Sequence, residues 1–295
     1  MKISTLRLPT RTVAARQDGN TFTEISGFTD VGALLQNPDW QDLATAADGP
    51  THDLTDTDLA PVVPRPGKII CVGVNYRQHI IEMGSEMPDH PTIFAKYAES
   101  LIGAEDDIQL PPEDSSLDWE GELAIIIGKP GRRIAEADAL DHIAGYTVLN
   151  DVSMRGFQFR TMQWLQGKTW ENSTPVGPAM VTPDELPADA TLRTTIDGEV
   201  MQETTIDDLL FGAREIIAYL STIFTLRPGD IIATGTPDGV GFARDPQRFL
   251  REGEVLETSI EGIGTLSNRV AAEILSTSKV PAAQGSHRTT PVMSS

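Results

Sequence analysis

Short stretches in which apolar and polar residues alternate recur along the chain, and this spacing is typical of β-strands covered on one face. We expect strands at 69–74, 92–96, 119–127, 146–149, 191–196, 199–202, 230–234, 255–260 and 264–270. Asp197-Gly198, which separates two of them, is a strong signal for a tight hairpin turn. Apolar residues recur at helical spacing at 31–35 and 213–224. Many short strands with few helices predict an α+β fold built on a large mixed sheet.

A proline-rich stretch, PVVPRPGK at 61–68, divides the chain, because proline stiffens the backbone and interrupts regular structure. We therefore expect a small N-terminal α/β module at 1–62 and a larger domain at 66–275. Residues 276–295 hold few large apolar side chains, so we expect them to form a loose tail.

The composition fits a protein with a sizeable core, since 39% of the 295 residues are hydrophobic and 22% are charged. No apolar run approaches the roughly 20 residues of a membrane-spanning helix, and the first residues lack the apolar stretch of a secretory signal. We expect a soluble, cytoplasmic protein without a membrane partner. The single cysteine, Cys71, excludes an intrachain disulfide, and its apolar surroundings are typical of a buried thiol rather than a nucleophile.

The formal net charge is −20, from 43 acidic and 23 basic residues. Nucleic acid is therefore a poor partner, because phosphate binding requires clustered basic side chains. The same charge repels small anions on average. A site for an anionic substrate must then carry positive charge of its own, from a metal ion, a lysine or an arginine.

Two glutamates lie at the start of the most apolar of the expected strands. Glu120 and Glu122 are two residues apart, so on a strand they project from the same face, roughly 7 Å apart at their Cα atoms. Asp151 follows another apolar stretch. Close like charges repel, and a hard divalent cation offsets both the repulsion and the lost hydration. Three carboxylates without a His or Cys cluster favour Mg²⁺ or Mn²⁺ over zinc. The alternative is that the glutamates lie on a solvated face and Asp151 in a turn.

A candidate general base lies on a short helix expected just after Asn75. Asn75 and Gln78 have the spacing of a helix cap with a reciprocal partner. His79 and Glu82 are three residues apart, so on this helix they share a face, and a carboxylate beside an imidazole raises its basicity. An ordinary, partly buried histidine is the alternative. The polar residues 83–91, which include glycine and proline, are typical of a mobile lid.

Six segments, taken in order, resemble the successive signatures of the fumarylacetoacetate hydrolase family. They are KIICVGVNYRQHIIEM (68–83), DWEGELAIIIGK (118–129), GYTVLNDVSMR (145–155), QWLQGKTW (163–170), TPVGP (174–178) and GDIIATGTPDGVG (229–241). Each segment alone is weak evidence, but their order over about 66–275 is specific. The resemblance implies the family's mixed β-sheet roll as the catalytic domain, usually in a homodimer, with one Mg²⁺ or Mn²⁺ per subunit.

The resemblance also implies roles for individual residues. Lys168 matches the family's active-site lysine, although an exposed lysine would be the ordinary interpretation of this position. His79 and Glu82 match its water-activating pair. Three residues match its metal-ligand motif: Glu120, Glu122 and Asp151.

Further positions are candidates for binding the substrate. Gly235 and Thr236 match the family's turn that approaches the substrate carboxylate, where small residues let backbone N–H groups reach an anion. Arg155 and Gln158 are candidates for its polar groups, with ordinary surface residues as the alternative. The family usually carries Asp after this arginine, whereas the chain has Gly156, so we expect Arg155 to lack the partner that steadies it.

The hypothesis that follows is hydrolysis of a carbon–carbon bond in a small 2,4-dioxo acid, such as an acylpyruvate or fumarylpyruvate. His79, oriented by Glu82, would activate water, and the metal ion and Lys168 would stabilise the enolate of pyruvate. A decarboxylase, isomerase or lyase acting on a 2-oxo acid such as oxaloacetate is the nearest alternative. A glycosidase with paired carboxylates and no metal, or a metal-stabilised protein without catalysis, are more distant ones.

Overall fold

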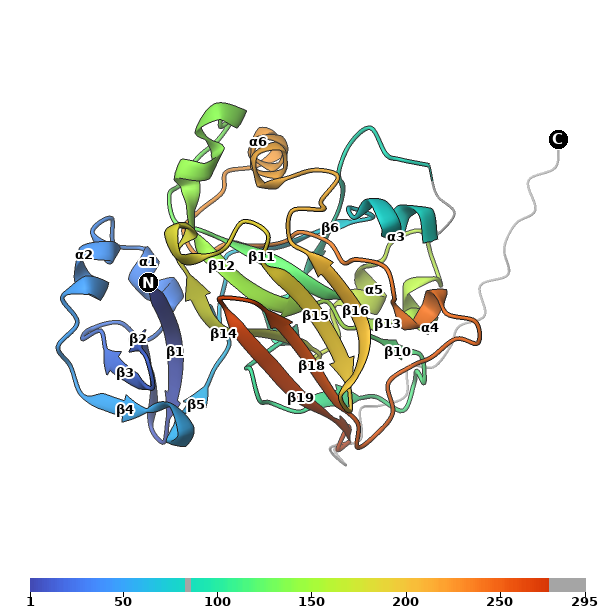
Figure 1. Ribbon diagram of the computed structural model, residues 1–295, viewed down its shortest axis with the longest axis horizontal. Helices are drawn as coiled ribbons and strands as arrows, with labels where there is room; N and C mark the ends of the chain where they lie inside the picture. The colour runs from blue at the N-terminus through green and yellow to red at the C-terminus, as the bar shows by residue number, and fades with distance from the viewer. Residues whose placement is uncertain (83–85, 276–295) are drawn as a thin grey trace, which may run out of the picture.

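The computed structural model describes residues 1–82 and 86–275, which form many strands and a few short helices (Figure 1). The strands are β1 Lys2–Leu8, β2 Arg11–Asp18, β3 Thr21–Glu24, β4 Thr51–Asp53, β5 Asp58–Leu59, β6 Ile69–Gly73, β7 Thr92–Lys96, β8 Leu101–Ile102, β9 Ile108–Leu110, β10 Leu117–Asp118, β11 Gly121–Ile127, β12 Ile143–Asn150, β13 Ser153–Met154, β14 Thr174–Val181, β15 Thr191–Ile196, β16 Glu199–Thr205, β17 Ile231–Ala233, β18 Val255–Ile260 and β19 Gly264–Ala272. The α-helices are α1 Val31–Leu35, α2 Trp40–Thr45, α3 Arg77–Glu82, α4 Arg155–Gln158, α5 Leu165–Lys168 and α6 Ala213–Ile223. The 3₁₀ turns are η1 Leu54–Asp56, η2 Ala98–Ser100, η3 Glu136–His142, η4 Pro183–Glu185 and η5 Gly241–Ala243.

Two large sheets carry the fold. The first has the strand order β4-β3-β2-β1-β14-β12-β11-β17-β6-β7, with β5 paired to β1 and β8 to β14. The second has the order β16-β15-β18-β19-β9 and packs across β11, β12 and β14 (Figure 1). Antiparallel pairs dominate, but β6 runs parallel to β17. This mixed-sheet α+β architecture confirms the predicted fold class.

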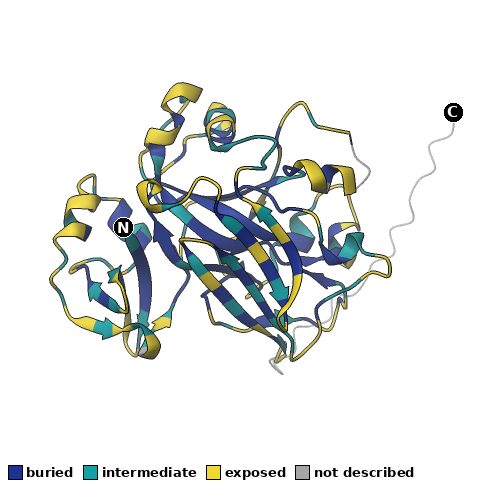
Figure 2. Cartoon of the chain, in the orientation of Figure 1, coloured by how far each residue is buried: buried dark blue, intermediate teal, exposed yellow. Residues whose placement is uncertain are grey.

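Strand β11 lies at the centre of the first sheet and is buried along its whole length, as the dark central ribbons of Figure 2 show. One face packs against α6, where Ile125 contacts the cluster that contains Ile216 and Leu220. Alternate residues such as Ile126 join a second cluster that contains Trp40 of α2. Because both faces of β11 are covered, its residues from Leu123 to Ile127 are all apolar, and the glutamates lie only at the beginning of the strand.

The N-terminal residues continue the first sheet. β1 pairs antiparallel with β14, with Ile3 opposite Met180, and β2, β3 and β4 follow outward from β1, while β5 pairs with β1 itself. Arg7 links this region to the rest of the chain through an ion pair with Asp106, 2.8 Å between Nη2 and Oδ2. Among the described residues, no helix is long and apolar enough to cross a lipid bilayer. The predicted tail at 276–295 lies outside the described residues.

The local predictions have mixed outcomes. The hairpin is confirmed: Asp197 and Gly198 both have positive φ, 48° and 82°, as a tight hairpin turn requires. The expected helix cap is wrong, because the Asn75 side chain does not cap α3. Its Nδ2 donates to the carbonyl oxygens of Thr234 and Phe211, and its Oδ1 accepts from the Phe211 amide. Asn75 therefore joins distant segments, which a local spacing rule does not anticipate.

Candidate metal centre and active-site cavity

Three carboxylates meet where β11 begins and β12 ends. The antiparallel register places Gly121 opposite Asn150. Glu120 and Glu122 lie on either side of Gly121, and Asp151 follows Asn150, so the three acidic residues are neighbours across the two strands. One carboxylate oxygen from each lies within 4.8 Å of the others, and all three residues are buried. The strand pairing thus brings together the residues that the sequence singled out, and buried like charges at this spacing call for a cation.

The backbone around these carboxylates is fixed by the neighbouring strands. The Asp151 amide donates to the Glu120 carbonyl at 2.8 Å, and the Glu120 amide donates to Asn150 Oδ1 at 2.9 Å. The Gly121 amide donates to Gln202 Oε1 at 3.0 Å, across the gap between the two sheets. A Cβ at Gly121 would lie 2.3 Å from Thr194 Oγ1, so close sheet packing requires glycine between the two glutamates.

Glu122 has the most perturbed environment of the three. Burial raises the pKa of its carboxyl well above the usual range, and repulsion from Asp151 and Glu120 adds to this. The Gly235 amide, which donates to Oε2 at 2.7 Å, acts in the opposite direction. An all-oxygen set with this much crowded negative charge fits a hard dication such as Mg²⁺ or Mn²⁺.

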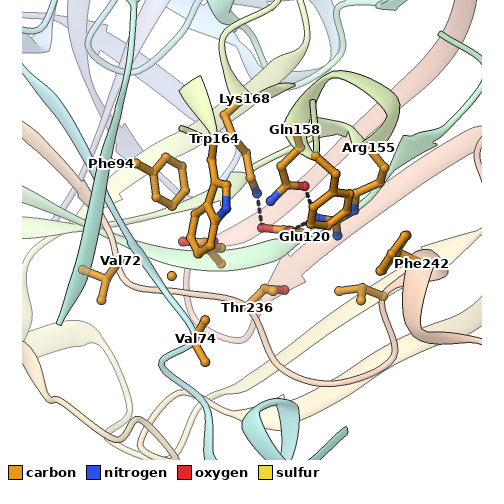
Figure 3. A pocket seen from close by; sticks show the side chains of 14 residues that line it. Val72, Val74, Phe94, Glu120, Arg155, Gln158, Trp164, Lys168, Thr236 and Phe242 are labelled. Atoms are coloured by element: carbon orange, nitrogen blue, oxygen red, sulfur yellow. Dashed lines mark hydrogen bonds and ion pairs between the residues drawn. The ribbon is translucent and has the colours of Figure 1, made fainter. Parts of the chain in front are cut away.

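The side chain of Lys168 points toward the carboxylate of Glu120 (Figure 3). Its Nζ is 2.6 Å from Glu120 Oε2 and 2.9 Å from Asp151 Oδ2. Burial alone would lower the pKa of Lys168, but the charges of Asp151 and Glu120 outweigh burial and raise it. The ammonium group therefore stays protonated at neutral pH, and it serves as a hydrogen-bond donor and a positive charge rather than as a base.

A second buried lysine was missed by the sequence analysis. Lys96, the last residue of β7, places Nζ 2.7 Å from Asp151 Oδ1 and also donates to the Lys168 carbonyl. Its side chain is fully buried and does not line the cavity described below. The segment around Lys96 carries no motif that would have revealed this role, since its partner, Asp151, is distant in the sequence.

Arg155 is firmly held, contrary to the expectation drawn from Gly156. Its Nε and Nη2 both lie 2.8 Å from Asp118 Oδ2, and its Nη1 lies 2.7 Å from Glu120 Oε1. Asp114 occupies the space beside Gly156, where a Cβ would lie 2.7 Å from Asp114 Oδ2. The missing neighbour is therefore replaced by Asp118, a fully buried carboxylate that the sequence analysis did not assign.

The remaining substrate-binding candidates have different positions. Gln158 Oε1 accepts from Arg155 Nη1 at 2.7 Å, which turns its amide nitrogen toward the cavity (Figure 3). Thr236 lines the cavity, and its Oγ1 donates to the Gly121 carbonyl and accepts from Gln202 Nε2. Gly235 does not line the cavity. The anion that its amide approaches is Glu122, so the expectation that it meets the substrate carboxylate is not retained.

A small cavity of about 170 Å³ opens above the carboxylates. Glu120, Glu122, Lys168, Arg155 and Gln158 form its polar surface (Figure 3). The remaining lining residues are mainly apolar: Val72, Gly73, Val74, Phe94, Phe159, Trp164, Thr236, Val240 and Phe242. A confined volume with a few convergent charged groups suits a small polar metabolite.

Comparison with known proteins decides the family. A family model described as "Fumarylacetoacetate (FAA) hydrolase C-terminal" matches residues 68–271. The chain belongs to the fumarylacetoacetate hydrolase family. The resemblance seen in the six sequence segments is thereby confirmed, and the protein is an enzyme of this family.

Relatives in the family have several activities. The oxaloacetate tautomerase FAHD2A, mitochondrial, of Bos taurus is 45% identical over 218 residues, which cover 72% of this chain and 69% of the relative. The solved fumarylacetoacetate hydrolase of Exiguobacterium antarcticum superimposes with a TM-score of 0.83 at 33% identity, covering 92% of this chain and 100% of the other. The 5-carboxymethyl-2-hydroxymuconate delta-isomerase of Mycobacterium smegmatis gives 0.78 at 33% identity, with coverages of 92% and 100%. The proteins to which this chain is similar thus include ones named as a tautomerase, a hydrolase and an isomerase.

The predicted acid–base pair of this family member lies on α3. The side chain of His79 is outside the described part of the structure, as are residues 83–85 of the predicted lid. Glu82 is described, and its carboxylate oxygens accept from the Gly239 amide at 3.1 and 3.3 Å. Gly239 directly precedes Val240, which lines the cavity, so the end of α3 is tied to the cavity rim.

Proposed function

We propose that this enzyme uses a divalent metal ion to interconvert the enol and keto forms of a small 2-oxo dicarboxylate of the oxaloacetate type. The observation that supports this most strongly is the charge balance of the buried cluster beneath the cavity. Four carboxylates (Asp118, Glu120, Glu122 and Asp151) face three cations (Lys96, Arg155 and Lys168). With all four carboxylates ionised, one bound dication would give this cluster a net charge of one positive, which favours a dianionic substrate.

Glu120, Glu122 and Asp151 are the residues that would hold the ion, Mg²⁺ or Mn²⁺. When bound, the ion supplies a Lewis acid for the negative charge that develops on a 2-oxo group during enolisation. The remaining roles fall to the protein's own side chains. Lys168, whose Nζ is held by Glu120 and Asp151, is proposed to donate to the same developing charge at the floor of the cavity.

Arg155 and the amide of Gln158 are proposed to hold the distant carboxylate of the substrate. Arg155 is fixed by Asp118 and Glu120, so it presents its charge without reorganising when the substrate arrives. His79, oriented by Glu82, is proposed to move the proton between carbon 3 and solvent or the enol oxygen. Tautomerisation relocates one proton, breaks no carbon–carbon bond and consumes no water, so these groups suffice.

The similarity to the bovine oxaloacetate tautomerase, at 45% identity, favours this reaction. Hydrolysis of a 2,4-dioxo acid is a second candidate, which the solved fumarylacetoacetate hydrolase with its TM-score of 0.83 favours. Hydrolysis would use the same His79–Glu82 pair to activate water against the distant carbonyl. A homodimer, which the family resemblance implies, remains a proposal.

The experiment adds enol-oxaloacetate to Mg²⁺-loaded protein and follows loss of the enol absorbance while a coupled assay measures pyruvate. We expect faster loss of the enol without pyruvate, and no acceleration after chelation. Lys168→Met should lower kcat by about 10²–10³-fold, whereas the exposed Lys129→Met is the matched control and should not. Stoichiometric pyruvate would indicate a decarboxylase, and faster cleavage of an acylpyruvate would establish the hydrolase. Inactivity on every 2-oxo acid would contradict both candidates.

A further inference from the structure

Two phenylalanines close one end of the cavity. Phe159 is the residue that follows α4, and Phe242 lies in η5; both line the cavity. Their ring centroids are 4.8 Å apart with an interplanar angle of 34°. Phe159 is 50% exposed, so the pair lies between the cavity and solvent. Two aromatic rings in contact form a continuous apolar wall at this end.

Asp118 fixes this wall relative to the charged groups. Its Oδ1 accepts from the Gly241 amide at 2.7 Å and its Oδ2 from the Phe242 amide at 2.9 Å, and Oδ2 also pairs with Arg155. A Cβ at Gly241 would lie 1.8 Å from the Arg248 carbonyl oxygen, so glycine is required for this approach. Through these contacts the buried Asp118 carboxylate joins Arg155, the first residue of α4, to η5. It thereby fixes the segments that carry the two phenylalanines.

Arg155 lies between this carboxylate and the wall. Its guanidinium carbon is 5.9 Å from the centroid of the Phe242 ring, within the range of a cation–π contact. Arg155 thus contacts the carboxylate cluster through Glu120 on one side and the Phe242 ring on the other, so a substrate carboxylate that pairs with Arg155 would lie next to this ring. Additional atoms beyond a carboxylate at Arg155 would have to displace the Phe242 or Phe159 ring.

The opposite end is built differently. Trp164 contacts Phe94 edge-on, with ring centroids 5.5 Å apart, and packs so tightly on Gly73 that a Cβ there would lie 2.5 Å from Trp164 Cζ3. Because the backbone of Gly73 lies directly against the Trp164 ring, this ring has little freedom to move away from a larger substrate. The Phe159–Phe242 wall borders solvent, so removal of one of its rings opens the cavity instead of leaving an internal void.

We propose that Phe159 and Phe242, positioned by Asp118, set the length of substrate that the enzyme accepts, so that four-carbon 2-oxo dicarboxylates fit and longer 2-oxo acids are rejected. This rests on the proposed function, since it specifies the substrate class of the same site. Shape rejection by an apolar wall discriminates by about 10- to 200-fold per methylene group.

The test compares kcat/KM for oxaloacetate with kcat/KM for 2,4-dioxo acids of increasing acyl length. In Phe242→Ala and Phe159→Ala, the ratio of long to short substrate should rise by about tenfold or more. Met162→Ala is the control, because Met162 is 96% exposed in the same loop and does not line the cavity. Ratios that stay within twofold of wild type in both phenylalanine variants would overturn the proposal.

A binding measurement separates this proposal from the proposed function. Isothermal titration of Mn²⁺-loaded protein with 2-oxoglutarate and 2-oxoadipate should show tighter binding to Phe242→Ala than to wild type. If wild type turns over no 2-oxo acid but Phe242→Ala still binds the longer acids more tightly, the proposed reaction is wrong and the role of the two phenylalanines is supported. If wild type turns over oxaloacetate and the phenylalanine variants change neither the binding nor the ratio of kcat/KM values, the proposed role of the phenylalanines is wrong and the proposed reaction is supported. Phe242→Leu, which retains an apolar side chain, replaces the alanine variant if circular dichroism shows the latter unfolded.

Discussion

Replacing Lys96 with methionine tests how the buried charges balance. Lys96 Nζ and Asp151 Oδ1 are 2.7 Å apart, and both side chains are fully buried. Methionine has a similar length but no charge, so Lys96→Met leaves one oxygen of Asp151 and the Lys168 carbonyl without this donor. The change isolates the contribution of a lysine that does not itself line the cavity.

The magnitude follows from burial. Removing one partner of a buried ion pair costs about 3–5 kcal/mol, because the remaining charge stays in a poorly solvated position. That is a large share of the roughly 5–15 kcal/mol by which folded domains are stable. In metal-loaded protein the loss should be smaller, since a dication at Asp151 neutralises the same carboxylate. Because the substitution then destabilises the metal-free protein more than the metal-loaded protein, Lys96→Met should bind Mn²⁺ more tightly than wild type does. Its affinity should rise by about tenfold for each 1.4 kcal/mol by which the loss of stability without metal exceeds the loss with metal.

The assay is urea denaturation of wild type and Lys96→Met, with chelator and with saturating Mn²⁺, alongside titration calorimetry of the ion. Lys129→Met, at an exposed lysine, should change the free energy of unfolding by less than about 0.5 kcal/mol. A loss below about 1 kcal/mol in chelator, or an equal loss with and without Mn²⁺, would show that Lys96 does not balance the charge of Asp151.

Three further predictions concern other parts of the chain. Gly73→Ala should lower the free energy of unfolding by about 1–3 kcal/mol and shift tryptophan fluorescence, because the new Cβ would lie 2.5 Å from Trp164; unchanged emission would contradict this. Gln202→Leu, which removes three hydrogen bonds beneath the site, should lower kcat and cost about 1–3 kcal/mol in urea denaturation; wild-type kcat would argue against it. Burial alone would raise the pKa of Asp106, but Arg7 and a backbone amide lower it below the usual value. Its stabilisation is therefore present above about pH 4 and is lost as pH falls through the depressed pKa, so Asp106→Asn should flatten the acid side of a melting-temperature profile; parallel profiles would contradict this.

The sequence identified the carboxylates because their positions follow from short-range rules. Glu120 and Glu122 lie at the start of the strongly apolar strand β11, and Asp151 directly follows β12, which pairs with it, so ordinary antiparallel register brings the three together. The hairpin at Asp197-Gly198 was predictable for the same reason, since one local conformation specifies it.

The support for these carboxylates could not be predicted in this way. Lys96, Asp118 and Gln202 each act through partners that are distant in the sequence, and no local spacing indicates them. The same long-range effect made two expectations wrong. Asn75 bonds to remote backbone instead of capping its helix, and Arg155 gains Asp118 as its partner despite Gly156. Tertiary contacts decide the hydrogen bonds of polar residues wherever several partners compete.

Glu122→Gln is the variant that isolates metal binding from folding. Burial and repulsion raise the pKa of Glu122, so the folded state disfavours its charge, and a neutral glutamine should fold at least as well in the absence of metal. Glu113→Gln, at an exposed glutamate, is the matched control.

Mn²⁺ titration of chelator-treated protein, followed by electron paramagnetic resonance and by enol-oxaloacetate turnover in the same samples, tests whether the three carboxylates hold a catalytic metal ion. We expect one ion per wild-type and Glu113→Gln chain, turnover that rises with occupancy, and affinity weaker by about a hundredfold or more in Glu122→Gln. Unchanged Mn²⁺ affinity in Glu122→Gln, or full turnover by metal-free protein, would contradict the account.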